Sequence, residues 1–185
     1  MARPPRVEAD GCTYHVISNG SAGAVIYRDA RDFRTFETML ERVVARFEWT
    51  CLAYCLMTTH YHLLITIRCG GLSRGMQQLN GGFARYVNRR YCRTAHVFRN
   101  RFFSGLVEGD EHLLETCRYI VLNPVRAGIC ERAEDWRWSS YRACAGRCPA
   151  PQFLALDELL ALLGRRPEEA MAAYRTFVEA GLAAS

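Results

Sequence analysis

The spacing of apolar positions divides residues 13–108 into six principal elements. Apolar side chains alternate where strands are expected and recur every three or four residues where helices are expected. Phe33, Phe36 and Leu40, for example, begin a stripe that continues along one side of a predicted helix. The elements are a strand at 13–18, a helix at 32–47, strands at 49–57 and 61–67, a helix from residue 72 and a strand at 96–108, with a further short strand at 24–27.

This succession predicts an α+β fold. The order β-α-β-β-α-β is that of a ferredoxin-like or RRM-like split unit, in which both helices cover one face of an antiparallel sheet. Ser73 is expected to cap the second helix, because a serine side chain can accept a bond from the free backbone N–H groups there.

A third helix is predicted after the sheet. It is expected to begin near Asp110 and to end by Asn123, because Pro124 disfavours helical backbone at the residue before it. Residues 136–141 are predicted to form a packed loop, and residues 157–163 and 167–179 two short helices. We therefore predict one domain at residues 1–142, whose last helix carries the candidate chemistry, and a C-terminal helical extension at residues 143–185.

The composition is that of an ordinary globular protein. Of the 185 residues, 50% are hydrophobic and 23% are charged, which excludes a disordered or fibrous chain. No apolar run approaches the roughly 20 residues needed to span a bilayer, and Met1 to Asp10 contain no apolar stretch typical of a secretory signal. We predict a cytoplasmic protein with no membrane partner, in which the nine cysteines are reduced.

The positive charge is concentrated in the middle of the chain. All 24 basic residues are arginine, and residues 68–106 hold eight of them, six aromatic residues and no carboxylate. Guanidinium groups beside aromatic rings are typical of a surface that binds nucleic acid, although a solvated face rich in arginine is the alternative. The residues predicted to contact phosphate are Arg74, Arg85, Arg89, Arg90 and Arg101.

Four residues are candidates for chemistry. His60 and His62 lie two apart on a predicted strand, so both imidazoles point to one face and can reach one metal ion; a polar strand edge is the alternative. Tyr119 and Asn123 lie four apart on the third predicted helix, outside its apolar stripe, so their side chains are neighbours. A surface tyrosine is the simpler interpretation of Tyr119 taken alone.

Together these side chains are suited to phosphodiester transfer. An ordinary tyrosine phenol is a weak nucleophile at neutral pH, and a phosphodiester repels an approaching anion. A divalent cation offsets both problems by polarising the phosphoryl group and fixing the phosphate in line with the attacking oxygen. Imidazole and amide ligands at His60, His62 and Asn123 favour Mg²⁺ or Mn²⁺, with zinc left open.

The sequence resembles the HUH single-tyrosine transposases and, within them, the REP-associated tyrosine transposases. The resemblance is colinear over about residues 10–142. Its most specific segments are Cys55-Leu56-Met57 leading to His60-Tyr61-His62-Leu63-Leu64, the run Arg118-Tyr119-Ile120-Val121-Leu122-Asn123-Pro124-Val125-Arg126-Ala127-Gly128, and Trp138-Ser139-Ser140-Tyr141. One departure is Thr58-Thr59, where the family usually has Pro-Asn before the histidine pair.

The resemblance implies a complete reaction. His60 and His62 are then the metal-binding histidines, and Asn123 stands where related transposases place a third polar ligand. Tyr119 is the nucleophile, which attacks single-stranded DNA to give a 5′-phosphotyrosine and a free 3′-OH that can rejoin strands. The implied substrates are imperfect DNA hairpins with a short adjacent guide sequence. Members with a C-terminal extension act as monomers, so a monomer is expected here, with a dimer left open.

Three other interpretations stay open from the sequence. The element order is also that of an RNA- or DNA-binding module without catalytic activity. A metal-dependent phosphodiesterase could use water instead of Tyr119 as the nucleophile. A degenerate transposase retained for DNA binding is the third, because Thr58-Thr59 removes the proline that stiffens the turn before His60.

Overall fold

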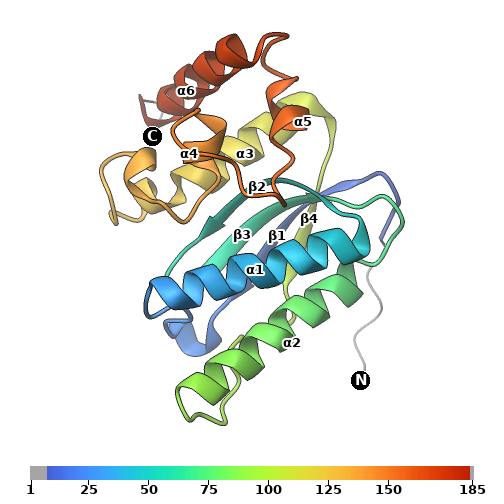
Figure 1. Ribbon diagram of the computed structural model, residues 1–185, viewed down its shortest axis with the longest axis vertical. Helices are drawn as coiled ribbons and strands as arrows, with labels where there is room; N and C mark the ends of the chain where they lie inside the picture. The colour runs from blue at the N-terminus through green and yellow to red at the C-terminus, as the bar shows by residue number, and fades with distance from the viewer. Residues whose placement is uncertain (1–7, 184–185) are drawn as a thin grey trace.

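The computed structural model describes residues 8–183 of the chain, and Figure 1 shows how its elements are arranged. The strands are β1 (Thr13–Asn19), β2 (Thr50–Leu56), β3 (His60–Thr66) and β4 (Phe103–Val107). The helices are α1 (Ala30–Phe47), α2 (Leu72–Arg90), α3 (Gly109–Arg126), α4 (Tyr141–Cys144), α5 (Leu156–Leu160) and α6 (Pro167–Ala183), with short 3-10 turns η1 (Ser21–Gly23) and η2 (Ala133–Asp135).

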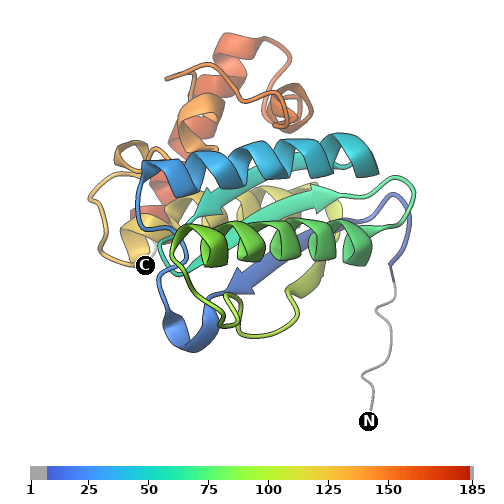
Figure 2. The same cartoon turned by 60° about the horizontal axis from the view of Figure 1, so that its bottom comes forward.

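The four strands form one antiparallel sheet in the order β2-β3-β1-β4. Helices α1 and α2 lie side by side on one face of this sheet, and α3 lies on the other (Figures 1 and 2). The prediction of a ferredoxin-like split unit followed by a further helix is therefore confirmed.

The two faces of β1 pack against different helices. Tyr14, Val16 and Ser18 are buried on the face covered by α1 and α2, whereas His15 and Ile17 point toward α3 because successive side chains of a strand alternate. The main core accordingly lies between the sheet and the first two helices. It includes the fully buried Val16, Phe36, Leu40, Leu63 and Phe83.

Local predictions failed at three places where tertiary contacts decide the backbone. Residues 24–27 form no strand, because the amides of Ile26 and Tyr27 bond the Thr58 carbonyl instead of a strand partner. Ser73 is not the N-cap of α2, which begins after Gly71 with its positive φ of 82°. The last strand begins at Phe103 rather than at residue 96.

The predicted end of the third helix was also wrong. Helix α3 continues through Pro124 to Arg126, and the amide of Ala127 still bonds the Asn123 carbonyl. A proline in the last turn removes only its own backbone bond, and the Pro124 ring is buried. The additional turn matters because it carries Arg126 on the same helix as Tyr119.

The C-terminal segments pack against β2 and α3. The backbone after η2 runs along the β2 edge, where Leu56 donates to Trp138 and Ser140 donates to Tyr54. Helix α6 then contacts α3. The predicted division between residues 142 and 143 falls within α4, and this division stays a prediction.

The cytoplasmic prediction rested partly on the amino-terminal segment, of which residues 1–7 lie outside the described residues. Among the helices that the structure describes, none has the length and apolar character needed to cross a membrane.

A buried carboxylate joins the first two helices. Asp32 of α1 is fully buried and accepts hydrogen bonds from the Arg28 amide (2.8 Å), the Tyr86 hydroxyl (2.9 Å), the Tyr91 hydroxyl (2.7 Å) and the Arg90 guanidinium. Burial alone would raise the pKa of Asp32, but these hydrogen bonds together hold that pKa below its ordinary value. The Asp32 carboxylate is therefore well supplied with hydrogen bonds, and those from Tyr86 and Arg90 hold α2 against α1.

Removing this carboxylate should destabilise the protein. We expect Asp32→Ala to lower the free energy of unfolding by at least about 3 kcal/mol, because it leaves the Arg90 charge with one partner fewer in a partly buried site. The neighbouring Arg89→Ala, at an exposed position, should change it by less than about 0.5 kcal/mol. Urea unfolding measures both. A loss below about 1 kcal/mol in Asp32→Ala would contradict the structural role.

Candidate active site

Three histidines gather on the face of the sheet that α3 covers. His60 and His62 lie two apart on β3, as predicted, and their ring centroids are 5.1 Å apart. His15 comes from the adjacent strand β1, and its Nε2 lies 3.0 Å from Nδ1 of His62. The antiparallel register of β1 with β3 brings His15 and His62 close enough to stack, with ring centroids 5.2 Å apart.

Helix α3 places Tyr119 directly against this cluster. The ring centroid of Tyr119 lies 5.8 Å from that of His62 and 5.9 Å from that of His15, in both cases edge to face. The tyrosine is nevertheless 43% exposed, so one side of its ring remains accessible to solvent. The structure therefore brings together a phenol and the predicted histidine pair from elements far apart in the sequence.

Asn123 is oriented differently from the other predicted residues. Its Nδ2 donates to the backbone carbonyl of Tyr119 at 2.9 Å, one helical turn back. Among the contacts of residues 8–183, none joins Asn123 to the histidines. Because the amide nitrogen is engaged by the helix, the carboxamide oxygen is the atom of Asn123 available to a ligand.

The turn before His60 is fixed without a proline. The carbonyl of Thr59 accepts from the Gly20 amide (2.7 Å) and that of Thr58 accepts from the Ile26 amide (2.9 Å). The Thr59 hydroxyl lies 3.1 Å from Nδ1 of His60 and orients its ring. Hydrogen bonds from residues after β1 therefore hold the turn at Thr58 and Thr59, where the transposases that the sequence resembles usually have Pro-Asn.

The histidine pair offers a donor set that suits a divalent metal ion. Nδ1 of His62 is engaged by His15 and Nδ1 of His60 by Thr59, which leaves the Nε2 atom of each ring for another partner. Nε2 of His62 is buried and has no hydrogen-bond partner within the described part of the chain. A buried nitrogen without a partner is costly unless a ligand binds it. The same residues contain no group of three His, Cys, Asp or Glu side chains that could hold a metal ion, so further ligands would have to be of another kind, such as an amide oxygen, a phosphate oxygen or water.

Burial keeps the imidazoles neutral. It lowers the pKa of His15 to about 4, and burial together with the nearby His15 and His60 lowers the pKa of His62 to about 3. Burial also lowers the pKa of His60. All three rings are therefore uncharged at neutral pH. In the tautomer in which Nδ1 of His62 donates to Nε2 of His15, the lone pair on Nε2 of His62 is available for a metal ion.

A cavity of about 500 Å³ opens beside Tyr119. It is lined by His15, Tyr119, Thr116 and Glu115 together with Arg118 and Arg126. The guanidinium carbon of Arg126 lies 5.4 Å from the centre of the Tyr119 ring, whereas Arg118 is paired with Glu115. An anion that reached Tyr119 would therefore meet the positive charge of Arg126.

Sequence reasoning missed both His15 and Arg126 as parts of the site. Arg126 lies seven residues after Tyr119, a spacing of two helical turns that could have been noticed had the helix not been ended at Asn123. His15 is a polar residue in an otherwise apolar strand, but its neighbour on β3 becomes known only from the strand register.

Four of the five arginines predicted to contact phosphate are available to do so. Arg74, Arg85, Arg89 and Arg101 are exposed and form no ion pair among the described residues. Arg74, Arg85 and Arg89 fall within about 60° of one another around α2, so they form one strip on that helix, on the face of the sheet opposite Tyr119. Arg90 instead bonds Asp29 and Asp32.

Comparisons with known proteins bear on the family and the fold of this chain. Residues 8–123 match the family described as IS200-like transposases. A protein of Haemophilus influenzae named as a REP-associated tyrosine transposase is 25% identical over 117 residues, which is 57% of this chain and 66% of that protein, slightly less than two thirds of its length. A solved structure of a REP-associated tyrosine transposase bound to a REP hairpin matches with a TM-score of 0.65 at 18% identity, covering 82% of this chain and 89% of the other. This structural match establishes the fold.

The burial of His62 predicts a loss of stability in acid. Below pH 6.5 the unfolded chain protonates His62, while the folded chain does not until about pH 3. The contribution of His62 to the free energy of unfolding is therefore complete above pH 6.5 and is lost progressively as the pH falls from 6.5 towards 3. At pH 5 this residue alone should cost roughly 2 kcal/mol, since each pKa unit is worth about 1.4 kcal/mol.

Urea unfolding in EDTA at several pH values measures this effect. His62→Gln should flatten the dependence between pH 7 and pH 5, and the matched variant His96→Gln, at an exposed histidine outside the cluster, should leave it unchanged. An equally steep dependence in His62→Gln would show that other groups are responsible.

Proposed function

This chain belongs to the family of IS200-like transposases, and from that premise we propose that it cleaves and rejoins single-stranded DNA beside a hairpin through a covalent tyrosine intermediate. The observation that carries the proposal is the contact of the exposed Tyr119 ring with His15 and His62. Tyr119 is partly exposed and lies beside His62, whose buried Nε2 has no hydrogen-bond partner among the described residues, and this arrangement suits a reacting phenol better than a residue that only packs.

The proposed cofactor is Mg²⁺ or Mn²⁺. His60 and His62 would hold it through Nε2, with the carboxamide oxygen of Asn123 as a third candidate ligand. When bound, such an ion polarises the phosphoryl oxygen and holds the scissile phosphate. The role of His15 is to keep the His62 ring in the orientation that turns Nε2 away from β1.

Tyr119 supplies the nucleophile of the proposed step. Its phenolic oxygen forms a bond to phosphorus while the bond from phosphorus to the 3′ oxygen breaks, which leaves a 5′-phosphotyrosine and a free 3′-OH. The phenol loses its proton, and the departing 3′ oxygen gains one. Arg126 stabilises the negative charge on the phenolic and phosphoryl oxygens from beside the ring. The reverse attack rejoins strands, because the phosphotyrosine bond retains the energy of the bond that was broken.

The proposed substrate is a DNA hairpin with an unpaired flank. The related solved structure carries a REP hairpin, which supports this class of substrate for the present chain. The exposed arginines of α2 and Arg101 form no ion pair among the described residues, so their charges are available to phosphate groups.

Covalent trapping tests the nucleophile. Wild-type protein incubated with end-labelled single strands from hairpins beside its own gene, in Mg²⁺ or Mn²⁺, should give a protein-DNA adduct on denaturing gels. Tyr119→Phe should abolish the adduct, because the attacking oxygen is missing, and EDTA should abolish it too. Tyr14→Phe, which alters a buried tyrosine on the opposite face of β1, should retain it.

Each other outcome would indicate a different activity for this protein. Cleavage that persists in Tyr119→Phe would indicate a nuclease that uses water. Binding without cleavage under every metal condition would indicate a non-catalytic module or a degenerate transposase retained for DNA binding.

Salt dependence tests the arginine surface. If Arg89 contacts a phosphate, Arg89→Ala should weaken binding of all single strands and reduce the slope of log affinity against log salt by about 0.7. Arg90→Ala should chiefly lower stability, since its charge is paired with Asp29 and Asp32. Fluorescence anisotropy at several salt concentrations measures the slope, and an unchanged slope in Arg89→Ala would remove that residue from the interface.

A further inference from the structure

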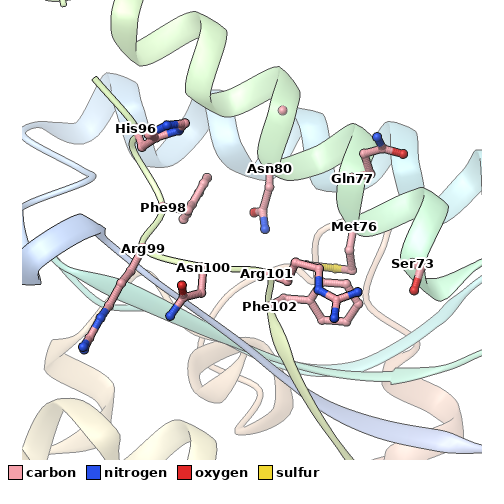
Figure 3. A pocket seen from close by; sticks show the side chains of 11 residues that line it. Ser73, Met76, Gln77, Asn80, His96, Phe98, Arg99, Asn100, Arg101 and Phe102 are labelled. Carbon is pink, nitrogen blue, oxygen red and sulfur yellow. The ribbon is translucent and has the colours of Figure 1, made fainter. Parts of the chain in front are cut away.

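A second cavity, of about 610 Å³, lies between α2 and the chain segment that leads into β4. Figure 3 shows that Met76 and Asn80 of α2 point into it, and that Phe98 and Arg101 reach it from the facing segment. Its walls thus combine apolar side chains with amides and a guanidinium. The remaining lining residues are Ser73, Gln77, Gly81, His96, Arg99, Asn100 and Phe102.

The inner wall of this cavity is held by hydrogen bonds. Asn80 accepts from the Tyr61 hydroxyl at 2.6 Å and donates to the Ser18 hydroxyl at 3.1 Å. Phe98 packs edge to face on Tyr61, with ring centroids 6.1 Å apart. The cavity is therefore formed in the free protein, and a ligand would meet little cost of ordering these groups.

The cavity adjoins the end of the sheet at which His60 lies. Phe98 forms a β-bridge with Gly20, and the Arg99 amide donates to the Asn19 carbonyl at 2.9 Å. Asn19 is the register partner of His60 on β3. The cavity and the Tyr119 site therefore lie on opposite faces of the sheet but meet at the same end of its central strands, and in Figure 3 the Arg99 side chain points away from the cavity.

An exposed aromatic residue lies between the two sites. Phe103, the first residue of β4, is 56% exposed and is paired with Ile17, whose other partner across the sheet is His62. Phe103 therefore stands on the same face and in the same row as His62. A single strand that leaves Tyr119 across this row would pass Phe103 before it reached the cavity.

The chemistry of the lining favours a nucleobase. No carboxylate lines the cavity, and neither Arg99 nor Arg101 forms an ion pair among residues 8–183. A flat ring can stack against the partly exposed Phe98, while Gln77 and Asn100 each offer a donor and an acceptor to its edge. An acidic peptide would be drawn by the same arginines but would leave the apolar walls without a partner.

We propose that this cavity binds one unpaired nucleobase of the DNA strand that Tyr119 cleaves, with Arg99 and Arg101 on the adjoining phosphates. The inference rests on the proposed function, because that function supplies the single strand. It adds a recognition site on the second face of the sheet, so that a base held there fixes which phosphate reaches Tyr119.

Abasic substitution locates the bound base. The probe is the hairpin with its unpaired flank, taken from DNA beside the gene of this protein, and binding is measured in EDTA so that cleavage does not contribute. Replacing the nucleotides of the flank one at a time with an abasic residue should weaken binding about tenfold at one position, as the loss of one stacked base does. An equal effect at every position, or none, would overturn the proposal.

A double variant links that position to the cavity. Gln77→Ala with Asn100→Ala, both exposed positions, should weaken binding of the intact strand several-fold but should not weaken binding of the strand that is abasic at that position. Gln78→Ala, beside Gln77 but outside the lining, is the matched control and should bind as wild type. Equal weakening of intact and abasic strands would contradict base recognition in the cavity.

The outcome separates the two proposals. If no adduct on Tyr119 forms but one abasic position still weakens binding, the cleavage mechanism alone is contradicted. If the adduct forms but no abasic position weakens binding, the nucleobase site alone is contradicted. Absence of binding to every strand would contradict both.

Discussion

The pairing of β1 with β3 is the constraint on which the site depends. In this antiparallel register Ile17 is opposite His62 and Asn19 is opposite His60, so the histidine pair lies beside the last residues of β1. A shift of one residue would turn His15 into the core and bring Val16 to the face covered by α3, because side chains alternate along a strand. The buried residues Val16 and Ser18 on the other face of β1 therefore fix the position of His15 as firmly as any contact within the site.

Helix α3 and the C-terminal helix complete the centre from the other side. Tyr119 must lie over the sheet within reach of the histidines, and α6 supports α3 behind it. Cys117 lies 3.9 Å from the Tyr174 hydroxyl, and the Arg118 guanidinium stacks 4.5 Å from the Phe177 ring centre. A side chain at Gly181 would come within 2.6 Å of Arg118, so glycine there permits the close approach of the two helices.

Local patterns in the sequence were sufficient for the fold but for only part of the site. The apolar periods located α1, α2 and the four strands, and the two-residue spacing of His60 and His62 placed both imidazoles on one face. His15 could not be assigned without the strand register. Arg90 is an arginine like its neighbours in the sequence, and only the structure shows that Asp29 and Asp32 hold its guanidinium away from solvent. The end of α3 was misjudged because a proline in a last turn costs little when its ring is buried.

In the proposed reaction Tyr119 is the nucleophile of a centre that α3 and the histidine strands build together. Tandem mass spectrometry of the protein-DNA product, after protease and nuclease digestion, tests it most directly by locating the attached nucleotide phosphate. We expect a phosphate-linked nucleotide on Tyr119 and on no other residue. A phosphate on a different side chain, or cleaved DNA with a free 5′-phosphate and unmodified protein, would contradict it.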